Sequence, residues 1–145
     1  MNPRILLIED SPERIVTFRR WLEGTGFVLI EASSGGRARG ILRKGMTDGI
    51  AGLCLDHDLD QQPVTPTDYL STSGLMASII LSIPRTTPVL IHSMNAQKPP
   101  GMERQLQCEG YSVTRCRMAA LTQERFNEWL DEVRDMWETI QEVSG

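Results

Sequence analysis

Short apolar runs alternate along the chain with longer segments in which apolar residues recur every three or four positions. The apolar runs predict five strands, at residues 4–8, 27–31, 52–55, 88–91 and 111–114. The longer segments predict five helices, at residues 12–22, 34–44, about 69–80, about 100–108 and 122–143. The first run is apolar after its first residue, which is typical of a central parallel strand covered on both faces.

Five strands that alternate with five helices predict an α/β fold, because parallel neighbours need right-handed crossover connections. We expect a three-layer sandwich in which a parallel sheet, in the order 2-1-3-4-5, carries helices on both faces. No linker or internal repeat interrupts the pattern, so residues 1–145 are expected to form one domain. Ligands of such sheets bind beyond the carboxyl ends of the strands, where the winding reverses between strands one and three.

Composition narrows the partners of the protein. With 15 basic and 19 acidic residues the net charge is −4, which argues against a broad nucleic-acid surface but leaves room for one phosphate in a pocket. Three cysteines, an odd number without zinc-site spacing, indicate neither a disulfide framework nor a structural metal. No apolar run is long enough to span a membrane or to serve as a signal peptide, so we expect a cytoplasmic protein without membrane contacts.

Four carboxylates follow the two strands that flank this reversal. Glu9 and Asp10 come after the first strand, and Asp56 and Asp58 come after the third. Clustered carboxylates repel one another and favour a bound cation, so this pattern predicts a site for Mg²⁺ or another divalent cation. The alternative is that Glu9 and Asp10 cap a helix while the other two are solvated loop acids.

Both histidines of the chain, His57 and His92, also fall at this edge of the predicted sheet. Two imidazoles beside a phosphate could act as general base and general acid, so His57, His92 and Asp56 are the catalytic candidates. A structural role is the alternative for each histidine. Strand alternation adds a constraint, because neighbours such as His92 and Ser93 cannot face the same way while the strand continues.

Four further residues are candidate phosphate ligands. Ser93 and Asn95 can donate hydrogen bonds, or can instead cap the next helix. Arg14 lies one turn into the first helix and could reach the anion, although a surface ion pair is its alternative. Of the basic residues Arg115 and Arg117, Arg115 lies closer to the predicted end of the fifth strand and is the candidate.

At these residues the sequence resembles the receiver domains of two-component signalling over nearly its whole length. Glu9 and Asp10 resemble the receiver's paired acids that hold Mg²⁺, Asp56 its phospho-accepting aspartate, and Ser93 its hydroxyl residue on strand four. The resemblance implies a flavodoxin-like, receiver-like fold. Residues 114–118 depart from it, because a receiver has a lysine followed by a proline after strand five.

Residues 55–59 (LDHDL) and 91–95 (IHSMN) more specifically resemble a divergent branch, the cyclic-phosphate processing receiver-like domains. That resemblance implies an Mg²⁺-dependent phosphoesterase acting on cyclic or terminal phosphates of RNA or nucleotides, with a phosphate-bearing small molecule or RNA end as its partner. One departure is residues 66–69 (PTDY), where the branch has a Thr-Gly pair.

Three functions are therefore expected in order. The first is the phosphoesterase, and the second is an atypical receiver phosphorylated on Asp56. The third is a degenerate receiver that only binds proteins. The apolar stripe of the last helix, with Trp129 and Trp137, is wide enough for a core face plus a homodimer contact, or for a core face alone.

Overall fold

The computed structural model describes residues 2–44, 49–56, 72–93 and 101–144, and all structural statements below concern these residues. Strands and helices alternate along the chain: β1 (Arg4–Ile8), α1 (Pro12–Leu22), β2 (Val28–Ala32), α2 (Gly35–Arg43), β3 (Ile50–Asp56), α3 (Thr72–Ser82), β4 (Val89–Ser93), α4 (Gly101–Cys108), β5 (Val113–Arg117) and α5 (Gln123–Ser144). A short 3-10 helix, Met118–Ala120, joins β5 to α5.

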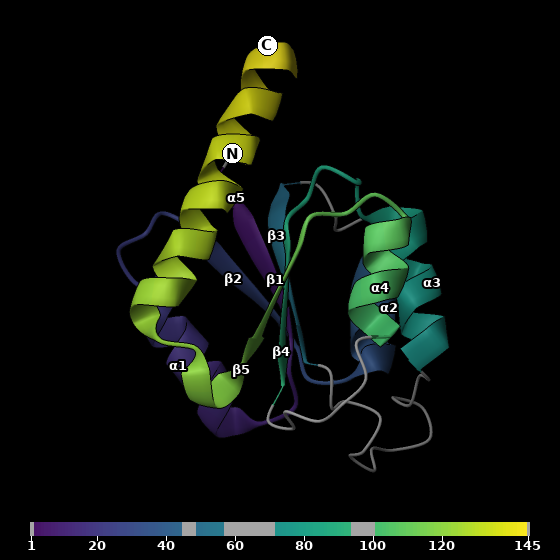
Figure 1. The fold of residues 1–145 in the computed structure, drawn as a ribbon, viewed down its shortest axis with the longest axis horizontal. Coiled ribbons are helices and arrows are strands. Elements are labelled where there is room, and N and C mark those ends of the chain that lie inside the picture. The colour runs from purple at the N-terminus through teal and green to yellow at the C-terminus, as the bar shows by residue number, and fades with distance from the viewer. Residues whose placement is uncertain (1, 45–48, 57–71, 94–100, 145) are drawn as a thin grey trace.

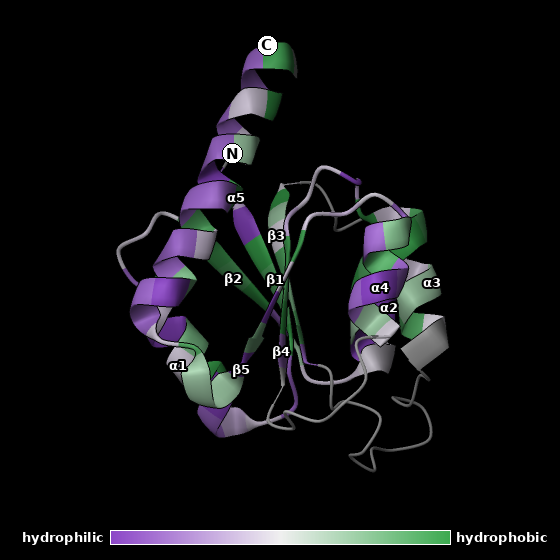
Figure 2. Ribbon diagram, in the orientation of Figure 1, coloured by the Kyte–Doolittle hydropathy of each residue, from purple (hydrophilic) through white to green (hydrophobic). Residues whose placement is uncertain are grey.

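One parallel sheet in the order β2-β1-β3-β4-β5 forms the centre of the molecule, which confirms the predicted topology. Helices α1 and α5 cover one face of the sheet, and α2, α3 and α4 cover the other (Figure 1). Each face has its own apolar core, one built around Phe18, Phe126 and Trp129 and the other around Met76, Ile79 and Leu106. Figure 2 shows hydrophobic residues concentrated on the central strands and hydrophilic residues along α1 and α5.

The last two strands lie further along the chain than predicted. Strand β5 spans Val113–Arg117 instead of 111–114, and β4 continues to Ser93 instead of ending at 91. Tyr111 caused the first error, because its buried ring lies before the strand and its hydroxyl donates to the carbonyl of Ile83 at 2.6 Å. As an edge strand β5 also lacks the continuous apolar run that marks the central strands.

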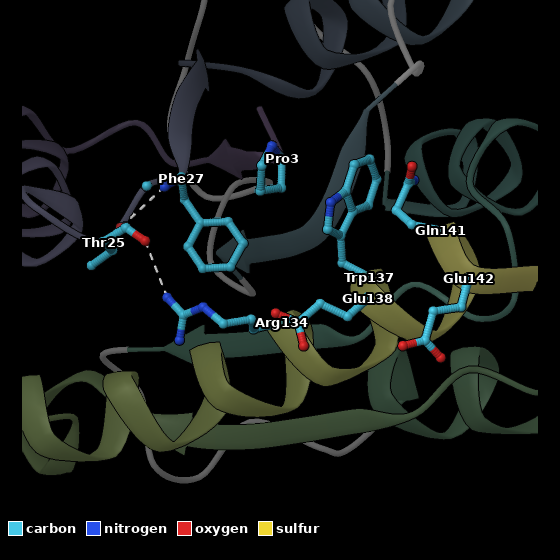
Figure 3. Close-up of a pocket in the computed structure, with 9 residues that line it drawn as sticks. Pro3, Thr25, Phe27, Arg134, Trp137, Glu138, Gln141 and Glu142 are labelled. Carbon is cyan, nitrogen blue, oxygen red and sulfur yellow. Dashed lines mark hydrogen bonds between the residues drawn. The ribbon is translucent and has the colours of Figure 1, made fainter. Parts of the chain in front are cut away.

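Helix α5 runs opposite to the strands and extends past the edge where they begin (Figure 1). There Trp137 of α5 faces Phe27 and Pro3 across a pocket of about 450 Å³ (Figure 3). Arg134 ties the helix to the turn before β2, because its guanidinium donates to the carbonyl of Thr25 at 3.1 Å and lies 5.1 Å from the centre of the Phe27 ring. No helix among the described residues is both long and apolar enough to cross a bilayer.

Candidate functional site

Glu9 lies directly after β1 with its side chain fully buried. Its backbone N–H donates to Ala32 of β2 at 3.0 Å. Its carboxylate accepts hydrogen bonds from the backbone N–H groups of Asp10, at 2.9 Å, and Ser11, at 3.2 Å. Ser11 is the N-cap of α1, as the sequence allowed, so Glu9 holds the turn that leads into that cap. The turn uses one oxygen of Glu9 and leaves the other for long-range partners.

Arg14 joins three carboxylates from the first turns of α1. Its Nε donates to Oε1 of Glu9 at 2.5 Å, and its Nη2 donates to Oε2 of Glu9 at 3.1 Å. The same Nη2 lies 3.4 Å from Oδ2 of Asp56 and 3.6 Å from Oδ1 of Asp10. Asp56 is the last residue of β3 and is 1% exposed, whereas the Arg14 side chain is 20% exposed. The guanidinium is therefore the solvent-facing part of this cluster.

His92 completes the cluster from β4, where it pairs with Asp56 in the register of the sheet. Its Nε2 lies 3.1 Å from Oε1 of Glu9, and its ring packs against Phe18 of α1 with 5.0 Å between the ring centres. The side chain is buried, and within the described part of the chain its Nδ1 has no hydrogen-bond partner. His92 thus holds Glu9 from below while Arg14 holds it from the solvent side.

Burial and charge act in opposite directions on the first two acids. Burial by itself would raise the pKa of Glu9, but hydrogen bonds with His92 and Arg14 outweigh burial, and the pKa of Glu9 is held well below its usual range. Burial raises the pKa of Asp10, and so does its hydrogen bond with Glu9. The hydrogen bond with Glu9 raises the pKa of Arg14, so the guanidinium is charged throughout the accessible range. Glu9 is therefore the ionised acid, and Asp10 ionises less readily.

The donor set suits a hard divalent cation. Glu9, Asp56 and His92 each offer one ligand atom, and these three atoms lie within 4.8 Å of one another. Asp10 adds a third, partly exposed carboxylate at the rim. Carboxylate oxygens are the ligands that Mg²⁺ prefers, and Mg²⁺ usually keeps several waters and takes few protein ligands. Glu9, Asp10 and Asp56 are thus the residues that could hold such an ion.

The structure brings together five of the predicted site residues, namely Glu9, Asp10, Arg14, Asp56 and His92. Three others, His57, Asp58 and Asn95, lie outside the described residues, so their roles stay predictions. Ser93 is the last residue of β4, next to His92 in the chain. The strand continues through both residues, as the alternation argument required.

Arg115 does not lie at the end of its strand. It pairs with Ile91 in the middle of β5, and its guanidinium lies 3.9 Å from Glu103 of α4. Arg117 is the last residue of β5 and pairs with Ser93, so it is the basic residue at the carboxyl edge. Sequence reasoning named both residues and preferred the wrong one, because the predicted strand ended three residues too early.

Comparison with known proteins gives a fold but no sequence family, because no family model and no curated protein sequence matches the chain. Among solved structures, a response regulator receiver domain protein from Clostridium thermocellum has a TM-score of 0.71 at 17% identity, covering 95% of this chain and 98% of that one. The signal receiver domain of an HD domain-containing protein from Pseudomonas fluorescens has a TM-score of 0.72 at 14% identity, covering 96% and 99%.

A third match has an ion in its site. The receiver domain of a sensor histidine kinase from Pseudomonas aeruginosa, with a magnesium ion coordinated in its active site cleft, has a TM-score of 0.65 at 16% identity, covering 92% and 98%. That ion belongs to the neighbour. Its relevance here is that a protein of this fold holds magnesium in its active site cleft.

These neighbours overturn the leading functional expectation. The prediction of a phosphoesterase acting on cyclic or terminal phosphates is wrong, because the structural matches are signalling receiver domains and favour the alternative, an atypical receiver. The geometry of His92 gives a physical reason. Its ring is 1% exposed, its Nε2 is engaged with Glu9, and it lies in the core beside Phe18, where it supports a carboxylate.

The strand order, the two helical layers and the position of the acids at the carboxyl ends of β1 and β3 agree with these matches. The chain has the flavodoxin-like fold of response-regulator receiver domains.

Proposed function

We propose that the chain is an atypical receiver domain in which Asp56 accepts a phosphoryl group. The observation that carries the proposal is the position of Asp56. It ends β3 at the edge where the winding reverses, and Glu9 and Asp10 follow the neighbouring strand β1. The matched receiver structures support the assignment of this edge as the reactive one.

The chemistry needed is an exchange of one phosphorus–oxygen bond for another. An Oδ atom of Asp56 attacks the phosphorus of a small donor such as acetyl phosphate. The bond from phosphorus to the acetyl oxygen breaks, and acetate leaves with the electron pair. The product is an acyl phosphate on Asp56, and the phosphoryl group carries its other oxygens with it unchanged.

The chain supplies charge and placement for this step. Glu9, Asp10 and Asp56 would hold a divalent cation, which when bound neutralises charge on the phosphoryl oxygens. Arg14 has donors within 3.4 Å of the accepting carboxylate, so its guanidinium can bind a phosphoryl oxygen on Asp56. His92 keeps Glu9 oriented by its contact with Oε1.

The test is phosphorylation of the purified protein by acetyl phosphate in Mg²⁺, followed by intact-mass measurement. We expect a gain of one phosphoryl group that disappears in Asp56→Asn and persists in Asp135→Asn, a control in which an exposed aspartate of α5 is changed. No mass gain in the wild-type protein, or an equal gain in Asp56→Asn, would contradict the proposal.

A second candidate function is a degenerate receiver that binds partner proteins without phosphorylation. The observation that favours it is the engagement of Glu9, whose carboxylate already contacts Arg14, His92 and two backbone N–H groups. This candidate predicts that the wild-type protein gains no mass from acetyl phosphate and that its melting temperature does not respond to millimolar Mg²⁺.

A further inference from the structure

The guanidinium of Arg14 lies among the carboxylates where a cation is needed. Two of its nitrogens bond to the two oxygens of Glu9, and one of these nitrogens is also within 3.4 Å of Asp56 and 3.6 Å of Asp10. A single side chain from α1 therefore contacts all three acids that would bind a metal. Its placement follows from the N-cap at Ser11, which starts α1 so that Arg14 lies one turn after Glu9.

The acids require such a charge when no metal is present. Glu9 and Asp56 are at most 1% exposed, and isolated carboxylates at that depth are strongly destabilising unless a cation compensates them. The other described arginines of α1 do not serve this purpose directly: Arg19 pairs with Glu31 of β2, for example, with nitrogen and oxygen 2.6 Å apart. Arg14 is thus the counter-charge that the described cluster contains.

A divalent ion and the guanidinium cannot share this place. Mg²⁺ would sit about 2.1 Å from oxygens of Glu9 and Asp56. Nη2 of Arg14 already lies 3.1 Å and 3.4 Å from oxygens of these two groups and uses the lone pairs that face the cluster. A bound ion would also repel the guanidinium across a few ångströms.

We propose that Arg14 is a built-in cation that occupies the carboxylate cluster in place of a divalent ion, so that metal binding requires its guanidinium to leave Glu9 and Asp56. This inference deepens the proposed function, because it concerns the regulation of the site that would accept the phosphoryl group. It does not require phosphorylation to occur. The displaced guanidinium is already the exposed part of the cluster, so it can swing toward solvent without opening the core.

The proposal implies an exchange of one stabilising cation for another. In the absence of metal, Arg14 stabilises the fold and weakens the affinity for Mg²⁺. Removing its charge while keeping a similar alkyl chain, as in Arg14→Met, should lower stability without metal and raise the affinity for Mg²⁺. A matched control is Arg19→Met, which removes an arginine from the same helix where it pairs with a partly exposed acid.

The experiment measures Mg²⁺ binding by calorimetry and melting temperature over a Mg²⁺ series, with no phosphodonor present. We expect Arg14→Met to melt lower than wild type without Mg²⁺, to gain more from saturating Mg²⁺, and to bind Mg²⁺ about tenfold more tightly, within the range usual for coupled binding events. Arg19→Met should bind Mg²⁺ as the wild-type protein does.

Arg14→Lys provides a second variant in case Arg14→Met does not fold without metal. A lysine keeps the charge but loses the two-nitrogen contact with Glu9, so its Mg²⁺ affinity should lie between those of wild type and Arg14→Met. Equal or weaker Mg²⁺ affinity in both variants would overturn the proposal, and so would the lack of any Mg²⁺ binding in all the proteins. Tighter binding in the variants would support it even if Asp56 proves not to accept a phosphoryl group.

Discussion

Glu9 is the residue on which the candidate site depends. It is fully buried, and its two oxygens are shared among the backbone of the turn, Arg14 and His92. Because the ionised form accepts all these hydrogen bonds, the folded state holds the pKa of Glu9 below its ordinary value of 4.5. Protonating Glu9 therefore costs folding free energy.

The sign of the pH dependence follows from this shift. A carboxyl whose pKa is lower in the folded state stabilises the protein above its unfolded pKa, and this stability is lost as the pH falls. We therefore expect the free energy of unfolding to decrease below about pH 4.5 through Glu9. Asp10 has a raised pKa and acts in the opposite sense above its ordinary value of 3.8, where its protonation favours the folded state.

Urea unfolding at a series of pH values tests this assignment. Glu9→Gln should flatten the loss of stability below about pH 4.5, because the variant has no proton to take up at this position. Glu13→Gln, at an exposed position on α1, serves as the control and should keep the slope of the wild-type protein. An unchanged acid slope in Glu9→Gln would mean that other acids dominate.

Strand β3 is the element against which α5 packs most tightly. A Cβ at Gly52 would lie 2.9 Å from Ile5 of β1 and 2.9 Å from the Trp129 ring of α5, and 3.2 Å from Val133. The lack of a side chain at position 52 therefore lets the helix approach the sheet. The rigid indole ring leaves little room for adjustment on that side.

Two glycine substitutions should have opposite effects. Gly52→Ala should destabilise the protein by about 1–3 kcal/mol, the usual cost of forcing extra volume into a packed core. Gly40→Ala, inside α2 where an added Cβ meets nothing within 4 Å, should stabilise it by about 0.5–1 kcal/mol because alanine is the better helix former. Chemical denaturation of the two variants checks both signs, and a stable Gly52→Ala would contradict the packing argument.

The molecule has two unlike ends. The carboxyl edge of the sheet holds the acids, whereas at the opposite edge α5 extends beyond the strands and carries Trp137 against the core around Phe27 (Figure 3). The apolar stripe of α5 weakens along this extension, since Val143 is 85% exposed. A homodimer contact through that stripe stays a prediction.

Trp137 should be the residue that anchors this extension. Trp137→Ala is expected to cost about 1–3 kcal/mol, because it removes a large, partly buried ring from the pocket wall. Val143→Ala, at an exposed position of the same helix, should change stability by less than about 0.5 kcal/mol. Thermal unfolding of both variants checks the difference, and equal effects would show that the extension does not pack as described.

Local patterns were enough to predict the order of elements, the topology of the sheet and the edge at which the acids gather. Apolar periodicities of two and of three to four residues depend on neighbours in the chain, and the crossover rule then leaves few topologies. The position of Glu9, Asp10 and Asp56 at one edge follows from that topology alone. The ends of β4 and β5 were less accessible, because an edge strand and a polar strand end carry little apolar signal.

Only the tertiary structure decided which side chains meet at that edge. The register of β3 with β4 pairs Asp56 with His92, and the burial of His92 beside Phe18 makes it a support for Glu9. The start of α1 at Ser11 and its packing on the sheet bring Arg14 to the three acids, where the sequence left a surface ion pair equally open. These contacts join residues up to 83 positions apart, so they depend on strand register and side-chain direction, which no local pattern specifies.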